Sequence, residues 1–219
     1  MSTLVKTWEY VLVNQGDFVL ALRDHLFLLV VVPVLLGTIV AVPLGIAATR
    51  WRPLEVIILS VVSTLQTIPS LAMIAVMIPL GLGIGYRPAV VAIFLYSLLP
   101  IVRNTYAGIN GVDGFLKEAA TGMGMTAFQR LVRVELPLAA PMIMAGIRTA
   151  TVIAVGTGTL AALVGGGGLG QYIVRGLNLI RDYIILAGAL PAAIMALLAD
   201  WLLGKVELAV TPRGLKLER

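Results

Sequence analysis

The sequence predicts an all-α integral membrane protein with about five transmembrane helices. Of its 219 residues, 59% are apolar and only 12% are charged, and the mean hydropathy is +1.01. A water-soluble globule of this size needs more polar side chains to cover its surface. Several apolar runs reach the length of about 20 residues that a helix needs to cross a bilayer. A polar segment, residues 118–137, interrupts these runs.

The composition excludes several classes of site. The net charge of +5 does not indicate a nucleic-acid partner, because the basic residues stand singly at the ends of apolar runs, which is a signal of membrane topology. The chain has no cysteine and therefore no disulfide or thiolate metal site. Its single histidine, His25, cannot form a metal site alone, and we expect it to play a structural role at the membrane interface. No Gly-x-x-x-x-Gly-Lys-Ser/Thr motif occurs, so we expect no ATP site and no bound cofactor on this chain.

Residues 1–21 are expected to form an N-terminal segment outside the cytoplasm, lying at the membrane interface. Apolar side chains recur on one helical face of residues 4–13, and Trp8 and Tyr10 suit the level of the lipid headgroups. The polar residues 14–17 then break the pattern. The segment lacks the apolar centre and small-residue cleavage site of a signal peptide.

Residues 26–48 are expected to form the first span. This run has 23 residues without a charge, and as a helix it would be about 34 Å long, enough to cross the bilayer with some tilt. Pro33 and Pro43 are expected to kink it. Arg50 and Trp51 follow it, as positive and aromatic residues do at a cytoplasmic interface.

Residues 54–80 are expected to form the second span, although its centre is polar. Polar groups are costly against lipid, so we expect them to face the bundle or a water-filled path. The alternative is that the hydroxyls bond back to the backbone of their own helix or to a neighbouring helix. The central polar group and its proline are Ser63, Thr64, Gln66, Thr67, Pro69 and Ser70. With two threonines of the fourth run, the candidate path-lining residues are Gln66, Thr67, Ser70, Thr157 and Thr159.

The third and fourth spans are expected at residues 88–107 and 138–164. Pro137 and Pro141 suit the first turn of a helix, where the missing N–H is not needed. Arg148 lies about 10 Å into the fourth span. We expect its guanidinium to extend back to the interface or to face a neighbouring helix, and contact with a solute is the less favoured alternative.

The end of the fourth run is rich in small residues. Gly156 and Gly158 allow neighbouring helices to approach closely. Residues 165–170, GGGGLG, lack the strand before and the lysine after that phosphate-binding loops have, so we expect a flexible external loop. Residues 183–203 are expected to form the fifth span, and residues 205–219 a cytoplasmic tail.

Residues 109–136 are expected to form a loop at one membrane face. Gly122 and Gly124 within it indicate either a break between two short helices or a close approach by another backbone. The segment from Glu118 resembles the loop shared by the membrane subunits of ABC importers: Glu-Ala-Ala, three residues, Gly, nine residues, an aliphatic residue, one more, then Leu-Pro. The matching positions are Glu118, Ala119, Ala120, Gly124, Val134, Leu136 and Pro137.

This resemblance implies a type I ABC importer permease fold over residues 22–204, in which the loop carries the coupling helix. Such a helix docks on a cytoplasmic ATPase and transmits its opening and closing to the spans. The resemblance also implies two ATPase subunits that bind ATP and magnesium, a second permease subunit, identical or a sister chain, and an extracytoplasmic solute-binding protein. Without the family motif, an ordinary amphipathic loop packed on its own helices is the alternative.

A second resemblance concerns the solute. The sequence VGGGGLGQYIVRGL from Val164, followed by the fifth apolar run and Pro212-Arg213-Gly214, looks like the permease subunits of osmoprotectant importers for glycine betaine, choline or carnitine. This similarity covers about residues 22–215. Methionine importers carry a related glycine loop, so methionine or another small solute is an alternative. An autonomous channel or secondary carrier is a further one, which the scarcity of charged residues at membrane depth disfavours.

The distribution of positive charge predicts the orientation in a bacterial or archaeal cell membrane. With five spans and an external N-terminus, ten basic residues fall on the side of the polar loop and five on the other. The ten are Arg50, Arg52, Arg103, Lys117, Arg130, Arg133, Lys205, Arg213, Lys216 and Arg219. The five are Lys6, Arg23, Arg87, Arg175 and Arg181. This bias predicts that the loop and the C-terminus are cytoplasmic.

Overall fold

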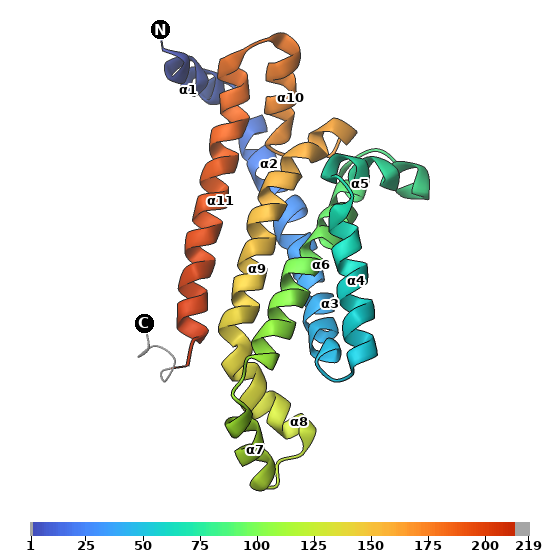
Figure 1. The fold of residues 1–219 in the computed structure, drawn as a ribbon. Coiled ribbons are helices and arrows are strands. Elements are labelled where there is room, and N and C mark those ends of the chain that lie inside the picture. The colour runs from blue at the N-terminus through green and yellow to red at the C-terminus, as the bar shows by residue number, and fades with distance from the viewer. Residues whose placement is uncertain (1, 213–219) are drawn as a thin grey trace.

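The computed structural model describes residues 2–212, and within that range it contains helices and no strands. The helices form an elongated bundle (Figure 1). The chain begins with α1 (Thr3–Val13) and turns at Asn14 into α2 (Gln15–Leu26). A π-helical turn, η1 (Phe27–Val31), then joins α2 to α3 (Val32–Ala48) without interruption. The helix that contains the expected first span therefore starts well before residue 26.

The expected second span is not one straight helix. It consists of α4 (Arg52–Thr67), α5 (Ser70–Met77) and η2 (Ile78–Leu82), and the two parts are bent by 95°. Because the residue before a proline is disfavoured in helical geometry, Ile68 is extended and Pro69 starts a new direction. The bend is fixed on α6: the Gln66 amide donates to the Tyr96 carbonyl at 2.9 Å, and the Tyr96 hydroxyl donates to the Ile68 carbonyl.

The centre of the bundle is formed by α6 (Tyr86–Asn110), α3 and α9 (Leu136–Thr159), with α6 packed between the other two. The close approach of α6 and α9 depends on glycine, because a Cβ on Gly146 would lie 2.8 Å from the Pro100 carbonyl oxygen. Leu29, Ile93 and Val155 belong to the buried core between these helices. Helix α9 continues from η3 (Leu131–Glu135) and ends in the 3₁₀ turn η4 (Leu160–Val164).

The glycine-rich segment between the fourth and fifth runs is a loop that contacts the bundle. After it comes a further helix, α10 (Gly170–Leu179), which packs against α11 (Asp182–Val210). The segment itself is bound to the bundle, because the Leu169 N–H donates to the Nδ1 atom of His25 at 3.3 Å. His25 is fully buried, and its Nε2 atom lies 3.1 Å from the Val155 carbonyl oxygen. It therefore lies inside the bundle and not at its surface.

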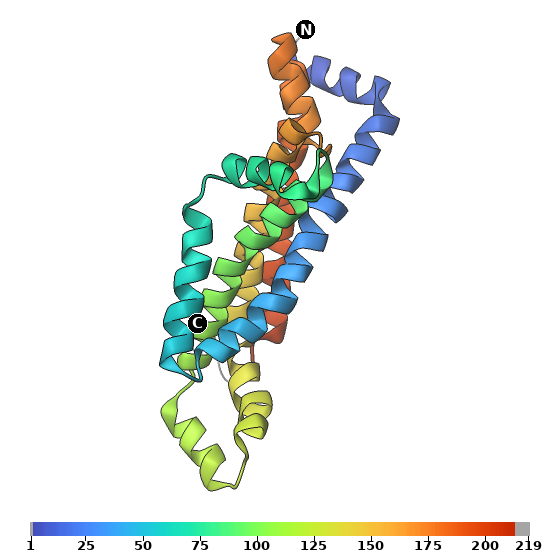
Figure 2. The same ribbon diagram turned by 90° about the vertical axis from the view of Figure 1, so that its right-hand side faces the viewer.

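Four helices of the described residues are long and apolar enough to span a membrane, and the bent α4–α5 pair gives up to five. The turn between α3 and α4, the loop after α6 and the end of α11 lie at one end of the bundle, which we call the α7–α8 end (Figures 1 and 2). Helices α1 and α10 lie at the opposite end, the α1–α10 end.

Candidate functional site

The polar loop folds into two short helices that project beyond the bundle (Figures 1 and 2). Helix α7 (Gly114–Gly122) is capped by Asp113, whose carboxylate accepts from the Phe115 N–H at 2.9 Å. Helix α8 (Ala127–Arg130) starts with a capping box between Thr126 and Gln129. Between the helices, Gly124 has φ +79°, a conformation that side-chain-bearing residues rarely adopt. Of the two alternatives expected for Gly122 and Gly124, the break between two short helices is present, and a Cβ on either glycine would meet no described atom within 4 Å.

The seven motif residues divide into two groups. Glu118, Ala119 and Gly124 are exposed on the outside of the loop, as is Pro137 at the start of α9. A Cβ on Gly124 would meet no atom of the described residues within 4 Å. The remaining three, Ala120, Val134 and Leu136, are buried or half-buried. The structure thus places the first group where a partner could reach it and the second where it holds the loop against its own chain.

The loop also carries a cluster of exposed large apolar side chains that the sequence analysis did not identify as a surface. Phe115, Met123 and Phe128 are each more than 70% exposed. Leu116 and Val132 are also exposed. Helices α7 and α8 stand clear of the apolar length of the bundle, so contact with lipid chains does not account for this cluster. An apolar patch of this kind marks an interaction surface.

A buried carboxylate anchors the loop to the bundle. The side chain of Glu135, 2% exposed, accepts from Arg50 Nη2 at 2.8 Å and from Arg130 Nε at 2.8 Å. Arg130 also donates to the Thr121 hydroxyl of α7 at 3.0 Å. These contacts join four elements: the α3–α4 turn, α7, α8 and η3, which leads directly into α9. Reading the sequence missed Glu135, although it lies within the motif between the two aliphatic positions.

The five candidate path-lining residues lie in two places. Gln66, Thr67 and Ser70 surround the bend between α4 and α5, whereas Thr157 and Thr159 lie in the last turns of α9. Helix α5 contacts η4, which directly follows α9, so both places lie in one region of the bundle. Several of their polar groups have partners within the chain. The Thr67 hydroxyl donates to the Thr64 carbonyl at 2.7 Å and the Thr159 hydroxyl to the Gly156 carbonyl at 2.8 Å.

Arg148 faces a neighbouring helix, one of the two positions expected for it. Its guanidinium forms a bidentate ion pair with Asp200 of α11, with nitrogen–oxygen distances of 2.5 and 2.6 Å. A further contact of 3.4 Å reaches Glu207. Gly204 makes room for this pair, since a Cβ there would lie 3.2 Å from the guanidinium. Arg148 therefore joins α9 to α11 near the α7–α8 end.

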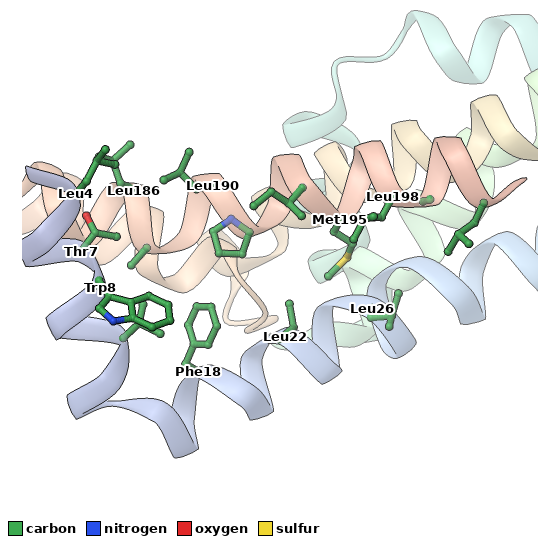
Figure 3. A pocket seen from close by; sticks show the side chains of 16 residues that line it. Leu4, Thr7, Trp8, Phe18, Leu22, Leu26, Leu186, Leu190, Met195 and Leu198 are labelled. Atoms are coloured by element: carbon green, nitrogen blue, oxygen red, sulfur yellow. The ribbon is translucent and has the colours of Figure 1, made fainter. Parts of the chain in front are cut away.

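Two cavities differ sharply in character. An apolar cavity of 690 Å³ lies between α1, α2 and α11, lined by Trp8, Phe18, Leu190 and other apolar side chains (Figure 3). A polar cavity of 370 Å³ lies at the α7–α8 end, beneath the α3–α4 turn. Its lining includes Glu55 and Tyr106. The Tyr106 hydroxyl donates to the Glu55 carboxylate at 2.6 Å.

Comparison with known proteins identifies a family. Residues 34–211 match the family described as "Binding-protein-dependent transport system inner membrane component". The chain is 49% identical over 203 residues, 93% of each chain, to a glycine betaine/carnitine/choline transport system permease protein of Bacillus subtilis. It is 47% identical to a choline transport system permease protein of the same organism, covering 95% of each chain. It is 43% identical to an osmoprotectant import permease protein of Salmonella typhimurium, covering 96% of this chain and 99% of that one.

Solved structures agree on the fold. A chain of the MetNI methionine ABC transporter, in an inward-facing conformation, superimposes with a TM-score of 0.80 over 91% of this chain and 98% of that chain, at 22% identity. A chain of an amino acid ABC transporter superimposes with a TM-score of 0.73 over 95% of this chain and 99% of that chain, at 18% identity.

Proposed function

Because the chain belongs to the family of binding-protein-dependent transport system inner membrane components, we propose that it is the permease subunit of an ATP-driven importer of osmoprotectants. As a member of this family it is a multi-pass inner-membrane transport permease and not an enzyme. Glycine betaine, choline and carnitine are the proposed solutes. This choice is supported by relatives that are 43–49% identical over nearly their whole length and that are named for these compounds.

We propose that the ATPase subunits act on the permease through the loop of α7 and α8. In this proposal the exposed apolar cluster and the exposed motif residues Glu118, Ala119 and Gly124 dock on one of two cytoplasmic ATPases that bind ATP and magnesium. The small motif residues permit a close approach, and Glu118 offers a charge to a basic or amide partner. The observation that carries the proposal is this exposed apolar surface, which stands beyond the bundle and carries the family motif.

The ion pairs of Glu135 supply a route from the docking surface to the spans. Docking moves α7 and α8, and Arg130 and Arg50 connect that movement to α9 and to the α3–α4 turn. Transport then proceeds by alternating access between this chain and a second permease subunit, identical or a sister chain. A solute-binding protein delivers the solute at the α1–α10 end. ATP drives the cycle only through its different affinity for the two states.

The docking proposal is tested by substituting Gly124 in the complete importer. We expect Gly124→Arg to lower solute-stimulated ATP hydrolysis at least about tenfold, because a large side chain would stand in the interface and remove contacts worth more than about 1.4 kcal/mol. Gly124→Ala is the matched control, since it has the same backbone strain at positive φ without the bulk. Both variants should insert into the membrane in normal amounts. Normal stimulated hydrolysis by Gly124→Arg would contradict docking at this surface.

Uptake assays test the solute. Cells that express the complete importer and lack other osmoprotectant uptake should accumulate labelled glycine betaine, choline or carnitine. Accumulation of methionine and none of these three would overturn the choice of solute while leaving the permease function intact. Transport by the purified chain without any ATPase would instead select an autonomous channel or carrier.

A further inference from the structure

Arg103 makes a hydrogen bond to a neighbouring helix and no ion pair within the described residues. It lies on α6, seven residues before the helix ends at the α7–α8 end. Side chains of a helix lean toward its N-terminus, which for α6 is the opposite end. The Arg103 guanidinium follows this direction and donates from Nη2 to the Ser63 hydroxyl of α4 at 3.1 Å. It therefore extends toward the interior of the membrane and not back to the nearby surface.

The position of Ser63 along α4 puts this guanidinium well away from the α7–α8 end. Helix α4 starts with Arg52 at the α7–α8 end, and Ser63 lies eleven residues farther along. That is a rise of about 16 Å, or about half of a hydrocarbon core of 30 Å. The side chain of Arg103 is exposed on the surface of the chain at this level. A charge at this depth is costly against lipid, and such residues face a partner or a water-filled cavity.

The surrounding surface of α4 is polar along one face. Ser60, Ser63, Thr64 and Thr67 are spaced as i, i+3, i+4 and i+7 and therefore lie along one side of the helix. Ser60, Thr64 and Thr67 are exposed. This hydroxyl stripe leads from the level of Arg103 to the bend at Ile68. Toward the α7–α8 end, the same pair of helices lines the polar cavity of Glu55 and Tyr106.

The charge of Arg103 is not neutralised within the described part of the chain. Arg148 is paired with Asp200 and Glu207, and the arginines at positions 50 and 130 share Glu135. For Arg103, residues 2–212 provide no carboxylate within ion-pair distance, and Ser63 is the side chain that it contacts by a hydrogen bond. A guanidinium presents a planar set of donors that matches a carboxylate in bidentate geometry. Arg103 therefore presents donors that fit a carboxylate, and no side chain of residues 2–212 pairs with them.

We propose that Arg103 binds the carboxylate of zwitterionic solutes as they cross the membrane along the hydroxyl stripe of α4. This inference rests on the proposed function, because it takes the solute to be an osmoprotectant. Glycine betaine and carnitine each carry a carboxylate beside a quaternary ammonium group. Choline has the same trimethylammonium head with a hydroxyl in place of the carboxylate. Arg103 therefore favours the two zwitterions over choline, since it attracts their carboxylates and repels the net positive charge of choline.

The test compares glycine betaine and choline uptake by the complete importer with Arg103→Gln. We expect kcat/KM for glycine betaine to fall at least about tenfold, because a charge-assisted bidentate contact is lost. For choline we expect no decrease, or an increase, because a repelling charge has been removed. Arg103→Lys keeps the charge without the planar donor set and should lose only part of the glycine betaine activity. The selectivity between the two solutes, and not the absolute rate, is the measured quantity.

Arg87→Gln is the matched control, because Arg87 is an exposed arginine at the other end of the same helix. It should leave the selectivity unchanged. Equal losses for both solutes in Arg103→Gln, with or without loss of the assembled complex, would overturn the proposal and assign Arg103 a structural role. Unchanged selectivity would overturn it as well. If the unmodified importer takes up none of glycine betaine, carnitine and choline, the proposed function itself fails; if it takes up carnitine but not glycine betaine, carnitine replaces glycine betaine in this comparison.

Discussion

Among single residues, Glu135 forms the contacts that hold the loop of α7 and α8 to the bundle. Its two arginine partners lie 85 residues before it and 5 residues before it in the sequence. The carboxylate is buried, whereas Arg50 and Arg130 are about one-third and one-quarter exposed. Hydrogen bonds to a charged group contribute about 1.5–3 kcal/mol each. Glu135 therefore stabilises both the local fold and the connection between the loop and the spans.

We expect Glu135→Gln to lower the stability of the purified permease by about 2–4 kcal/mol, since two charge-assisted hydrogen bonds become weaker ones or are lost. The measurement is thermal unfolding in detergent. The same variant should hydrolyse ATP in the complete importer with weakened stimulation by solute, because the loop is less firmly connected to α9. Glu118→Gln is the control: this exposed carboxylate should leave the melting temperature unchanged. A Glu135→Gln variant as stable as the parent chain would contradict the anchoring role.

Residue spacing identified the exposed part of the docking loop but not its buried anchor. The Glu-Ala-Ala pattern and the glycine four positions later are local in sequence, so Glu118 to Gly124 could be placed on a loop. Glu135 lies in a polar segment, where a glutamate is ordinarily expected at the surface. Its partner Arg50 belongs to a different turn and could be read only as a topology signal. A contact over 85 residues depends on tertiary packing, which spacing alone does not reveal.

At the level of elements, the bend between α4 and α5 shows the limit of hydropathy. Residues 54–80 form one apolar run, but Pro69 removes a backbone donor and Ile68 is extended, so the chain turns by 95°. The polar centre of this run indicates side chains facing the bundle or a water-filled path, and it does not predict the bend. The helix α10 was missed because glycine residues precede it, and they have low helix propensity. Its position is fixed by packing on α11.

The pairing of α6 with α9 leads to a prediction about helix packing. A side chain at Gly146 would overlap α6, since a Cβ there lies 2.8 Å from both the Asn104 Cβ and the Pro100 carbonyl oxygen. We expect Gly146→Leu to destabilise the purified permease by about 2 kcal/mol or more, because overpacking forces the helices apart. Thermal unfolding in detergent measures the effect.

Gly156 provides the control on the same helix. It is exposed, and a Cβ there would meet no described atom within 4 Å. Gly156→Leu should therefore leave the melting temperature of the purified subunit within about 2 °C of the parent chain, as surface substitutions usually do. Equal destabilisation by both substitutions would show that the contact with α6 is not the cause; helix propensity cannot be the cause either, because leucine forms helices more readily than glycine.

For the whole molecule, the two ends of the bundle differ in the number of basic residues. Ten basic residues are assigned to the α7–α8 side, and nine remain when Arg103 is counted within the membrane. Three of these nine lie in residues 213–219, outside the described range. Five lie at the α1–α10 end. The rule that positive charge stays in the cytoplasm then predicts that α7 and α8 lie inside the cell. The prediction from sequence thus keeps its direction after one residue is reassigned.

The absence of cysteine allows this orientation to be tested with single introduced thiols. Met123→Cys places a thiol between α7 and α8, at a position that is 72% exposed. Gln171→Cys places one at an exposed position of α10, at the opposite end. In intact cells, a membrane-impermeant maleimide should label Gln171→Cys and leave Met123→Cys unlabelled. After permeabilisation, it should label both, which shows that Met123→Cys is accessible in the folded protein.

The reverse labelling pattern would place the docking loop outside the cell, where no cytoplasmic ATPase can reach it. That result would contradict both the orientation and the proposed source of energy, whatever the solute. A second experiment uses inverted vesicles, in which the cytoplasmic side faces the reagent. There, labelling of Met123→Cys should be lower with the co-expressed ATPase than without it, because the docked partner covers the loop. Protection of Met123→Cys together with unchanged labelling of Gln171→Cys would tie the exposed apolar cluster of α7 and α8 to the motor subunit.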